Sequence, residues 1–177
     1  MATPLERLLA DDYLGDLPGR PMEELRAMRA ECQEVETGLS LVRRLVQGHL
    51  DIVTIERARR EDGGEPGDLG DLLALLPEVL ADRTQSTGVG RLPGQMAPAE
   101  LDPALEEELG ALVGPGLVVD PSHLDDAALD ELLGRLQALE ADVSGRRRAI
   151  FERLDAVQDE VARRYRTGDA SVDTLFT

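Results

Sequence analysis

The chain has 177 residues, the length of one ordinary domain, and its 19 basic residues, all arginine, stand against 36 acidic residues for a formal net charge of −17 at pH 7. This charge argues against direct binding to duplex DNA, whose phosphates would be repelled at long range. With two phenylalanines, two tyrosines and no tryptophan, the core must be aliphatic. The single cysteine, Cys32, excludes an internal disulfide, and with no visible signal peptide or transmembrane run it indicates a cytoplasmic protein.

Residues 1–20 form an N-terminal arm. They begin with the apolar-rich run LERLLADDYL and end with LPGRP, which predicts either a short amphipathic helix or a flexible arm. Because the first dozen residues of a chain are often frayed, we favour the frayed arm.

The first long helix is predicted over residues 21–60. Pro21 suits the first helical turn, and Glu23 and Glu24 suit the positive end of the helix dipole. Apolar residues recur in steps of three and four, as in a coiled-coil seam. The seam positions are Leu25, Met28, Cys32, Val35, Leu39, Val42, Val46, His49 and Val53. A seam this narrow requires one or two long partner helices.

Residues 61–121 form a connection that is too long for a tight hairpin loop. We expect an apolar helix from Leu69 to Arg83, a loose run STGVGRLPGQMAP, and a second short helix from Pro103 to Val113. The negative charge gathers here, because residues 61–139 hold three arginines against seventeen acids. This acidic body suits a basic protein partner, including one whose nucleic-acid-binding surface it covers.

The second long helix is predicted over residues 122–167, followed by a tail at 168–177. Ser122 with Asp125 resembles a capping box at its start. Its apolar seam consists of Leu129, Leu132, Leu136, Leu139, Val143, Ile150, Leu154, Val157 and Val161. Between Val143 and Ile150 the next seam position falls on Arg146 or Arg147, where packing alone would favour leucine. An arginine at a position where packing favours an apolar residue often marks a functional site.

A polar motif recurs on both predicted helices. In the first helix it reads E-x3-S-x2-R-x3-Q-x3-D, and it returns 104 positions later with phenylalanine in the glutamine slot. The members are Glu36, Ser40, Arg43, Gln47 and Asp51 in the first copy and Glu140, Ser144, Arg147, Phe151 and Asp155 in the second. Aligning 36–60 with 140–164 gives 11 identities, which indicates a duplicated helix. At about 100° per residue the motif falls in one stripe about 80° wide.

The heptad phase of the two copies predicts the fold. If Val35 and Leu139 both occupy d positions, the motif glutamates and arginines fall at e and the serines at b. In an antiparallel pair the e positions of one helix lie beside those of the other. We therefore predict an all-α protein, an antiparallel two-helix coiled-coil hairpin with a long, partly helical and partly flexible connection. Both stripes would then form one composite surface with pseudo-twofold symmetry.

The residue types of the stripe match a guanine nucleotide better than a bare phosphate. Arginine offers paired donors to guanine O6 and N7 or to phosphate oxygens, and its plane stacks on bases. Carboxylates accept hydrogen bonds from guanine N1–H and N2–H2, while serine and glutamine serve phosphate or base edges. A pseudo-twofold arrangement of these groups suggests a twofold-symmetric ligand.

The paired motif, together with the runs LRAMRAECQEVETGLSLVRRLVQGHLDI and EVARRYRTGDASVDTLF, resembles the RsiG family of cyclic di-GMP-responsive anti-sigma factors of actinobacteria. The resemblance covers roughly 20–60 and 123–177, and the connection at 61–121 shows no clear match. It implies that the hairpin binds cyclic di-GMP as a dimer of the dinucleotide. The loaded protein would then hold regions 2 and 4 of a WhiG-type sporulation sigma factor away from RNA polymerase.

Carried over to this chain, the resemblance assigns the ligand positions to nine residues. They are Glu36, Ser40, Arg43, Gln47, Asp51, Glu140, Ser144, Arg147 and Asp155. Phe151 departs from the pattern, and it either stacks on a base or weakens that half-site. Phe151, Arg44 and Arg148 are candidates for positions beside the ligand. Two motifs in one chain imply a monomeric ligand-binding unit.

Two other classes of function remain open at this point. A constitutive coiled-coil adaptor would bind a partner without nucleotide control, and its stripe would be a salt-bridged surface. An enzyme that hydrolyses cyclic di-GMP ranks last, because no metal-ligand cluster or nucleophile–base pair is visible. Cys32 and His49 fit the seam as core positions, and His123 beside a helix start has no second ligand nearby.

Overall fold

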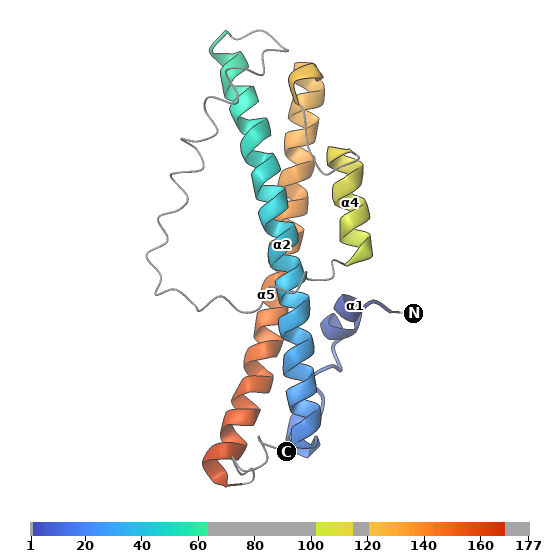
Figure 1. Cartoon of the computed structure of the whole chain (residues 1–177), viewed down its shortest axis with the longest axis vertical. Coiled ribbons are helices and arrows are strands. Elements are labelled where there is room, and N and C mark those ends of the chain that lie inside the picture. Colours follow the sequence, from blue (N-terminus) through green and yellow to red (C-terminus); the bar gives the residue numbers. More distant parts are fainter. Residues whose placement is uncertain (1, 64–101, 115–120, 169–177) are drawn as a thin grey trace. The chain divides into compact units, whose positions relative to one another are not determined.

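The computed structural model describes residues 2–63, 102–114 and 121–168, and within these ranges every regular element is helical. Figure 1 shows the elements in chain order. They are α1 (Pro4–Leu9), the 3₁₀ turn η1 (Leu17–Gly19), α2 (Met22–Glu61), α4 (Pro103–Val113), the 3₁₀ turn η2 (Pro121–His123) and α5 (Asp126–Thr167). The predicted short helix from Pro103 to Val113 is confirmed. The predicted helix from Leu69 to Arg83 and the tail from 169 onward lie outside the described residues.

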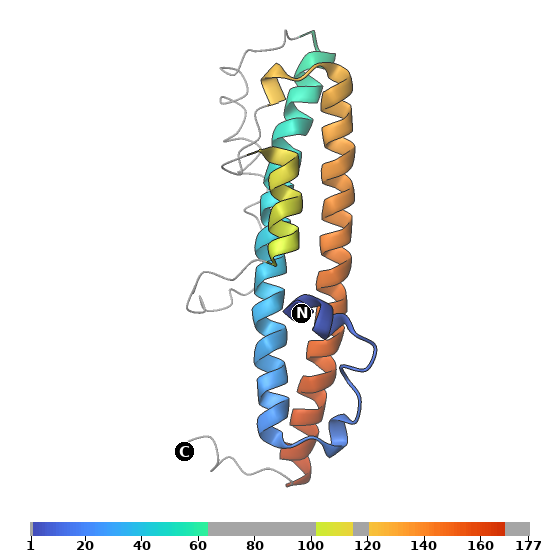
Figure 2. The ribbon, with the colours of Figure 1, turned by 90° about the vertical axis from the view of Figure 1, so that its right-hand side faces the viewer.

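The chain divides into two compact units, and both long helices contribute to each. Unit 1 comprises Met1–Leu41, Ala99–Asp102 and Val143–Thr177, and unit 2 comprises Val42–Pro98 and Pro103–Asp142. Within each unit the α2 segment lies beside the α5 segment and runs antiparallel to it (Figures 1 and 2). The predicted fold class, an antiparallel two-helix hairpin of the coiled-coil type, is confirmed.

The buried residues of each unit follow the predicted seam. In unit 1, Leu25 and Met28 form a cluster with Val157 and Val161, and Tyr13 and other partly buried side chains pack against it. In unit 2 the buried seam side chains include Val42, Val46, His49, Val53, Leu129, Leu136 and Leu139, and Leu105, Leu109 and Val113 of α4 are buried as well. At roughly 25 cal/mol per Å² of apolar surface, such side chains supply most of the free energy that holds the two helices together.

The N-terminal arm is ordered against unit 1. Thr3 caps α1 through a reciprocal capping box with Glu6, and Leu5 and Leu8 are buried. The guanidinium of Arg153 on α5 donates from Nη2 to the carbonyl oxygen of Leu9 at 2.9 Å. This bond satisfies one of the carbonyl groups that have no partner within the helix at the C-terminal end of α1. The favoured frayed arm was therefore wrong, and the alternative of a short amphipathic helix is confirmed.

The start of the second long helix differs from the prediction. Pro121–His123 form a 3₁₀ turn, and α5 begins only at Asp126. The carboxylate of Asp125 accepts a hydrogen bond from the backbone N–H of Ala128 at 2.8 Å, as an N-cap residue does. Ser122 is buried inside the turn, so the capping box predicted for Ser122 with Asp125 was wrong.

The duplication covers more than the long helices. The turn η2 begins 104 positions after η1 (residues 121 and 17), α5 begins 104 positions after α2 (126 and 22), and α4 ends 104 positions after α1 (113 and 9). Each repeat therefore consists of a short helix, a 3₁₀ turn and a long helix. The buried Leu5 and Leu109 occupy corresponding positions in the two short helices.

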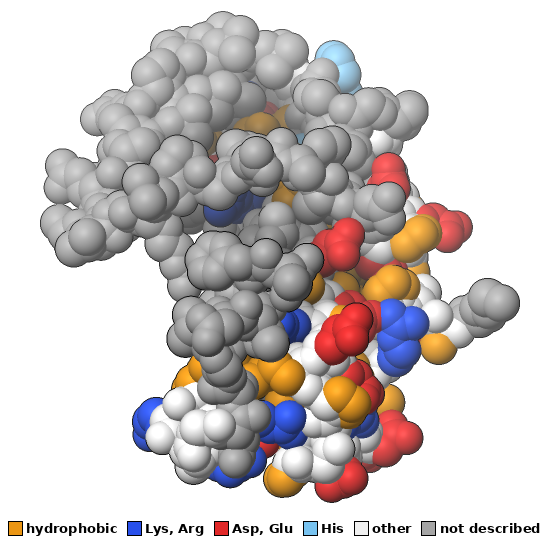
Figure 3. Space-filling model, turned by 60° about the horizontal axis from the view of Figure 1, so that its bottom comes forward, with side chains coloured by type: hydrophobic (Ala, Val, Ile, Leu, Met, Phe, Trp, Pro, Cys, Tyr) orange, Lys and Arg blue, Asp and Glu red, His pale blue; other side chains and the backbone are white. Residues whose placement is uncertain are grey.

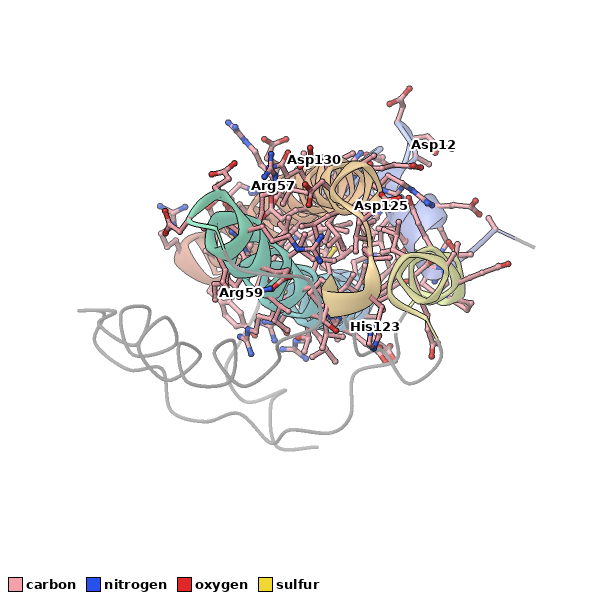
Figure 4. The ribbon with its side chains drawn as sticks, turned by 90° about the horizontal axis from the view of Figure 1, so that it is seen from above. Asp12, Arg57, Arg59, His123, Asp125 and Asp130 are labelled. Atoms are coloured by element: carbon pink, nitrogen blue, oxygen red, sulfur yellow. The ribbon has the colours of Figure 1, made fainter. Side chains whose placement is uncertain are left out.

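A buried ion cluster joins the end of α2 to the turn before α5. In unit 2 the carboxylate of Glu56, 1 % exposed, accepts hydrogen bonds from Arg59 Nε at 2.9 Å and Arg60 Nε at 2.6 Å. Arg60 continues to the turn, donating to the carbonyl oxygens of Pro121 at 3.0 Å and Leu124 at 2.7 Å. Figure 4 views this unit from its end and shows Arg59 on α2. We call this group the Glu56 clamp.

Unit 1 repeats the arrangement with the corresponding residues of the second repeat. Glu160 accepts from Arg163 Nε at 2.8 Å and from Arg164 Nε at 2.7 Å. Arg164 Nη2 then donates to the carbonyl oxygens of Leu17 at 2.9 Å and Pro18 at 3.1 Å, in the turn that precedes α2. This Glu160 clamp and the Glu56 clamp each tie the end of one long helix to the beginning of the other.

Candidate functional site

The motif residues of unit 1 gather around one guanidinium. Arg147 on α5 donates from Nε to Glu36 Oε1 and to Ser40 Oγ on α2, both at 2.8 Å. Ser40 Oγ in turn donates to Glu36 Oε1 at 2.6 Å. Arg147 keeps 32 % of its side chain exposed and Glu36 keeps 18 %. The group is therefore ordered yet open to a ligand from solvent.

Phe151 supports the same guanidinium from α5. The Arg147 Cζ atom lies 4.7 Å from the centre of the Phe151 ring, the distance of a cation–π contact. The phenylalanine in the glutamine slot thus orients the motif arginine one turn before it.

The motif residues of unit 2 form the reciprocal group. Arg43 Nε on α2 donates to Glu140 Oε1 on α5 at 3.0 Å, and Gln47 Nε2 donates to the same oxygen at 3.3 Å. Arg43 keeps 36 % of its side chain exposed and Glu140 keeps 23 %. We call the Arg147 group the unit 1 half-site and the Arg43 group the unit 2 half-site.

The two half-sites share one plan. In each, the glutamate of one motif copy binds the arginine of the other copy. In each, the residue of the glutamine slot supports that pair, Gln47 by a hydrogen bond to Glu140 and Phe151 by its ring under Arg147. The two copies of the motif therefore form the same kind of interaction between α2 and α5.

The other predicted ligand residues lie in different settings. Asp51 and Ser144 are half-buried, and Asp155 is exposed. Arg44 is exposed, and Arg148, 85 % exposed, faces Glu152 at 3.5 Å along its own helix. The structure therefore brings Glu36, Ser40, Arg147 and Phe151 together in the unit 1 half-site and Arg43, Gln47 and Glu140 together in the unit 2 half-site, and it leaves Arg44 and Arg148 on the surface.

The break in the α5 seam is real. Val143 and Ile150 are fully buried, while Arg146 and Arg147 between them are only half-buried. The side chain of Arg147 reaches across to Glu36 and Ser40 on α2. The seam is interrupted at the residue that anchors the unit 1 half-site.

Neither clamp was predicted from the sequence, although the clamp residues are among the positions that are identical in the two repeats. A further signal was available, because Glu56 and Glu160 continue the heptad spacing of buried seam positions. Hydrogen bonds from Arg59 and Arg60 lower the pKa of Glu56. Arg163 and Arg164 lower the pKa of Glu160 to about 2. Both glutamates are therefore charged at neutral pH, and their contacts are structural.

Two further observations bear on the class of protein. Within residues 2–63, 102–114 and 121–168, no cluster of three or more His, Cys, Asp or Glu side chains is arranged to hold a metal ion. No helix in these ranges combines the length and apolar character needed to cross a lipid bilayer. Among the described side chains seen in Figure 3, acidic and arginine side chains are interspersed with apolar ones.

Comparison with known proteins places the chain in a family. No protein of curated function matches it significantly. The family model described as RsiG-like matches residues 11–80 and 118–177, which include both motif copies, both clamps and the turns they hold. This match covers well over half of the chain. The chain therefore belongs to the RsiG-like family, a family of regulatory anti-sigma factors.

Proposed function

We propose that this protein binds cyclic di-GMP through its two half-sites and, when loaded, sequesters a WhiG-type sigma factor from RNA polymerase. The observation that carries the proposal is the reciprocal pairing of motif residues, Glu36 with Arg147 and Glu140 with Arg43. A pairing made by residues that recur at a fixed spacing is more specific than an ordinary solvated helix face.

The chemistry of the half-sites suits a guanine dinucleotide. Arg147 uses only Nε in its contacts with Glu36 and Ser40, and its two terminal amino groups have no hydrogen-bond partner within the described ranges. These donors fit guanine O6 and N7 or a phosphate oxygen. The second oxygen of Glu36 is suited to accept hydrogen bonds from guanine N1–H and N2–H2.

The contacts already present would lower the cost of binding. A side chain with many rotamers loses roughly 0.5–1.5 kcal/mol of entropy when a ligand immobilises it. Arg147 is held by Glu36, Ser40 and Phe151 before any ligand arrives, and Arg43 is held by Glu140. The half-sites are therefore preorganised, and one chain supplies both, so we expect about two dinucleotides per monomer.

The partner is proposed from the family and from charge. An RsiG-like chain with a net charge of −17 suits the basic, nucleic-acid-binding surfaces of sigma factor regions 2 and 4. Direct DNA binding and membrane association form no part of the proposal. The regulated step would be transcription of sporulation genes in an actinobacterial cytoplasm, with sigma released when the dinucleotide level falls.

The proposal is tested with arginine variants of the half-sites. Arg43→Ala and Arg147→Ala should each abolish cyclic di-GMP binding and nucleotide-dependent capture of purified WhiG-type sigma factor, while circular dichroism shows unchanged helicity. Arg135→Ala removes an exposed arginine of α5 as the control and should behave as wild type. Undiminished binding by both half-site variants would refute the assignment.

A constitutive adaptor remains the second candidate, because the motif pairs are satisfied within the protein itself and would serve as plain cross-links between helices. That candidate predicts sigma capture that ignores nucleotide. It also predicts that Ser40 and Ser144 tolerate bulky residues without loss of capture. The nucleotide-gated candidate predicts loss in both experiments.

A further inference from the structure

We propose that Arg29 is an additional anion-binding residue of the unit 1 half-site, positioned for a phosphate of the bound dinucleotide. This inference rests on the proposed function. Arg29 lies on α2 seven residues before Glu36, which places it on the same side of the helix about 10 Å farther along the axis. It therefore extends the motif stripe by two turns within unit 1.

The side chain of Arg29 lacks a partner where one is expected. Its Nε atom is buried and makes no hydrogen bond, and the residue forms no ion pair within residues 2–63, 102–114 and 121–168. Buried donors in native proteins are almost always satisfied, and an exception calls for an explanation such as a bound ion. Although the chain has 36 acidic residues, Arg29 has Leu25 and Gln33 as its i±4 neighbours.

The antiparallel register places Arg29 beside the unit 1 half-site. Moving seven residues back along α2 from Glu36 corresponds to moving seven residues forward along α5 from its partner Arg147, to Leu154. Phe151 lies one turn before that position on the same helix. The helix α1 packs nearby through an ion pair between Arg7 and Glu31, and Glu31 lies about 200° around α2 from Arg29. The side of α2 that carries Arg29 and Glu36 is therefore turned away from that contact.

The two repeats differ at the position of Arg29, and this difference supports a role for Arg29 in the unit 1 half-site. Its counterpart in the second repeat, 104 positions on, is Leu133, which carries no charge. The unit 1 half-site has Phe151 where the unit 2 half-site has Gln47, so it lacks one amide donor. An arginine at position 29 supplies a cation to the half-site that has lost this donor. Arginine is well matched to phosphate because its donors form a planar fork.

The test replaces Arg29 by methionine, which keeps the length of the side chain and removes both the charge and the unsatisfied donor. For Arg29→Met we expect a free protein that melts at the wild-type temperature or higher, because a buried unpaired N–H is gone. We expect cyclic di-GMP affinity, measured by calorimetry on the full chain, to fall by about tenfold or more. The matched control Arg135→Met removes an exposed arginine and should bind as wild type.

The outcomes separate this inference from the function on which it rests. If wild type does not bind cyclic di-GMP, the proposed function fails. If wild type binds and Arg29→Met binds equally well, the half-sites stand and only the role of Arg29 is refuted. If Arg29→Met melts lower, Arg29→Lys decides: a lysine that recovers affinity supports phosphate binding, and one that does not shows a structural role.

Discussion

Phe151 stands where the first motif copy has a glutamine, yet the two residues have related structural roles. Gln47 donates to the carboxylate of Glu140, and the ring of Phe151 lies under the guanidinium of Arg147. Each holds the ion pair of its half-site in place, one through the acid and one through the base. The departure from the motif therefore preserves the geometry of the arginine.

Replacing Phe151 separates the support of Arg147 from other roles of the ring. Phe151→Ala removes a partly exposed cation–π contact, so we expect cyclic di-GMP affinity to fall about two- to fivefold. Phe151→Gln restores the residue type of the other half-site and should bind more tightly than the alanine variant. Calorimetric titration measures both, and equal affinities of the two variants would show that the slot does not orient Arg147.

His49 is the polar residue of the unit 2 seam. It is 6 % exposed, neither ring nitrogen has a hydrogen-bond partner in the described ranges, and burial lowers its pKa. The unfolded chain therefore takes up the proton first, so stability is lost as pH falls below the ordinary histidine pKa of about 6.5. His49→Leu should melt at a higher temperature and show a smaller loss between pH 7.5 and 5.5 in thermal unfolding. A pH profile identical to that of wild type would contradict this account.

At the scale of the elements, each clamp fixes where a long helix begins relative to the end of its partner. The Arg60 side chain is only 4 % exposed, and it connects Glu56 to backbone carbonyls of the turn at Pro121. Arg60→Ala leaves these backbone carbonyls without their arginine donor and removes one of the two arginines that bind Glu56, so we expect the free energy of unfolding to fall by about 2–3 kcal/mol in urea titrations. Arg57→Ala is the control.

Arg57 lies three residues away on the same helix and pairs with Asp130 on α5 at 2.7 Å (Figure 4). Its side chain is 30 % exposed, so its removal should lower the free energy of unfolding much less than the removal of Arg60 does. Equal losses for Arg60→Ala and Arg57→Ala would mean that the clamp acts as an ordinary surface ion pair.

The clamps also predict sensitivity to acid. The pKa of Glu56 and Glu160 is lower in the folded protein than the ordinary glutamate value of about 4.3, because arginines donate to both carboxylates. Their contribution to stability is therefore present above that value and lost as pH falls toward about 2, the pKa of Glu160. A variant with both glutamates changed to glutamine should show a flatter melting-temperature profile between pH 5 and 2.5. The exposed Glu152→Gln serves as control, and parallel profiles would contradict the prediction.

Periodicity predicted the two long helices well, because a narrow seam of apolar residues leaves few other ways to bury them. It could not predict α1, whose order depends on the tertiary contacts of Leu5, Leu8 and Arg153. The start of α5 was misplaced because Ser122 looks like a cap by type alone. Its position in a buried turn held by Arg60 depends on tertiary contacts, which residue type alone does not reveal.

In the candidate site, too, some features could be predicted from local sequence patterns, and others depend on tertiary structure. Helical geometry placed the motif members on one stripe and the heptad phase placed the two copies on facing edges. The choice of partners, Glu36 with Arg147 and Glu140 with Arg43, depends on the register between helices, which spacing within one helix does not contain. The sequence could not predict a role for Arg29, because its distinguishing feature is an unsatisfied buried donor, which depends on the folded structure.

At the scale of the whole molecule, two sequence repeats supply one chain with two half-sites built from the same residue types. Each repeat contributes a short helix, a turn and a long helix at a constant offset of 104 residues (Figures 1 and 2). Because each half-site takes its glutamate from one repeat and its arginine from the other, neither repeat alone holds a complete half-site. Ligand binding should therefore stabilise the pairing of the two long helices within each unit.

The most direct test is calorimetric titration of the full chain with cyclic di-GMP, with GTP and cyclic di-AMP as controls, repeated in the presence of a WhiG-type sigma factor. We predict saturable binding of the guanine dinucleotide alone, at about two molecules per chain, and its loss in Arg43→Ala and Arg147→Ala. If no saturable binding occurs either with or without sigma, the paired motifs are cross-links between helices and the nucleotide-binding function is refuted.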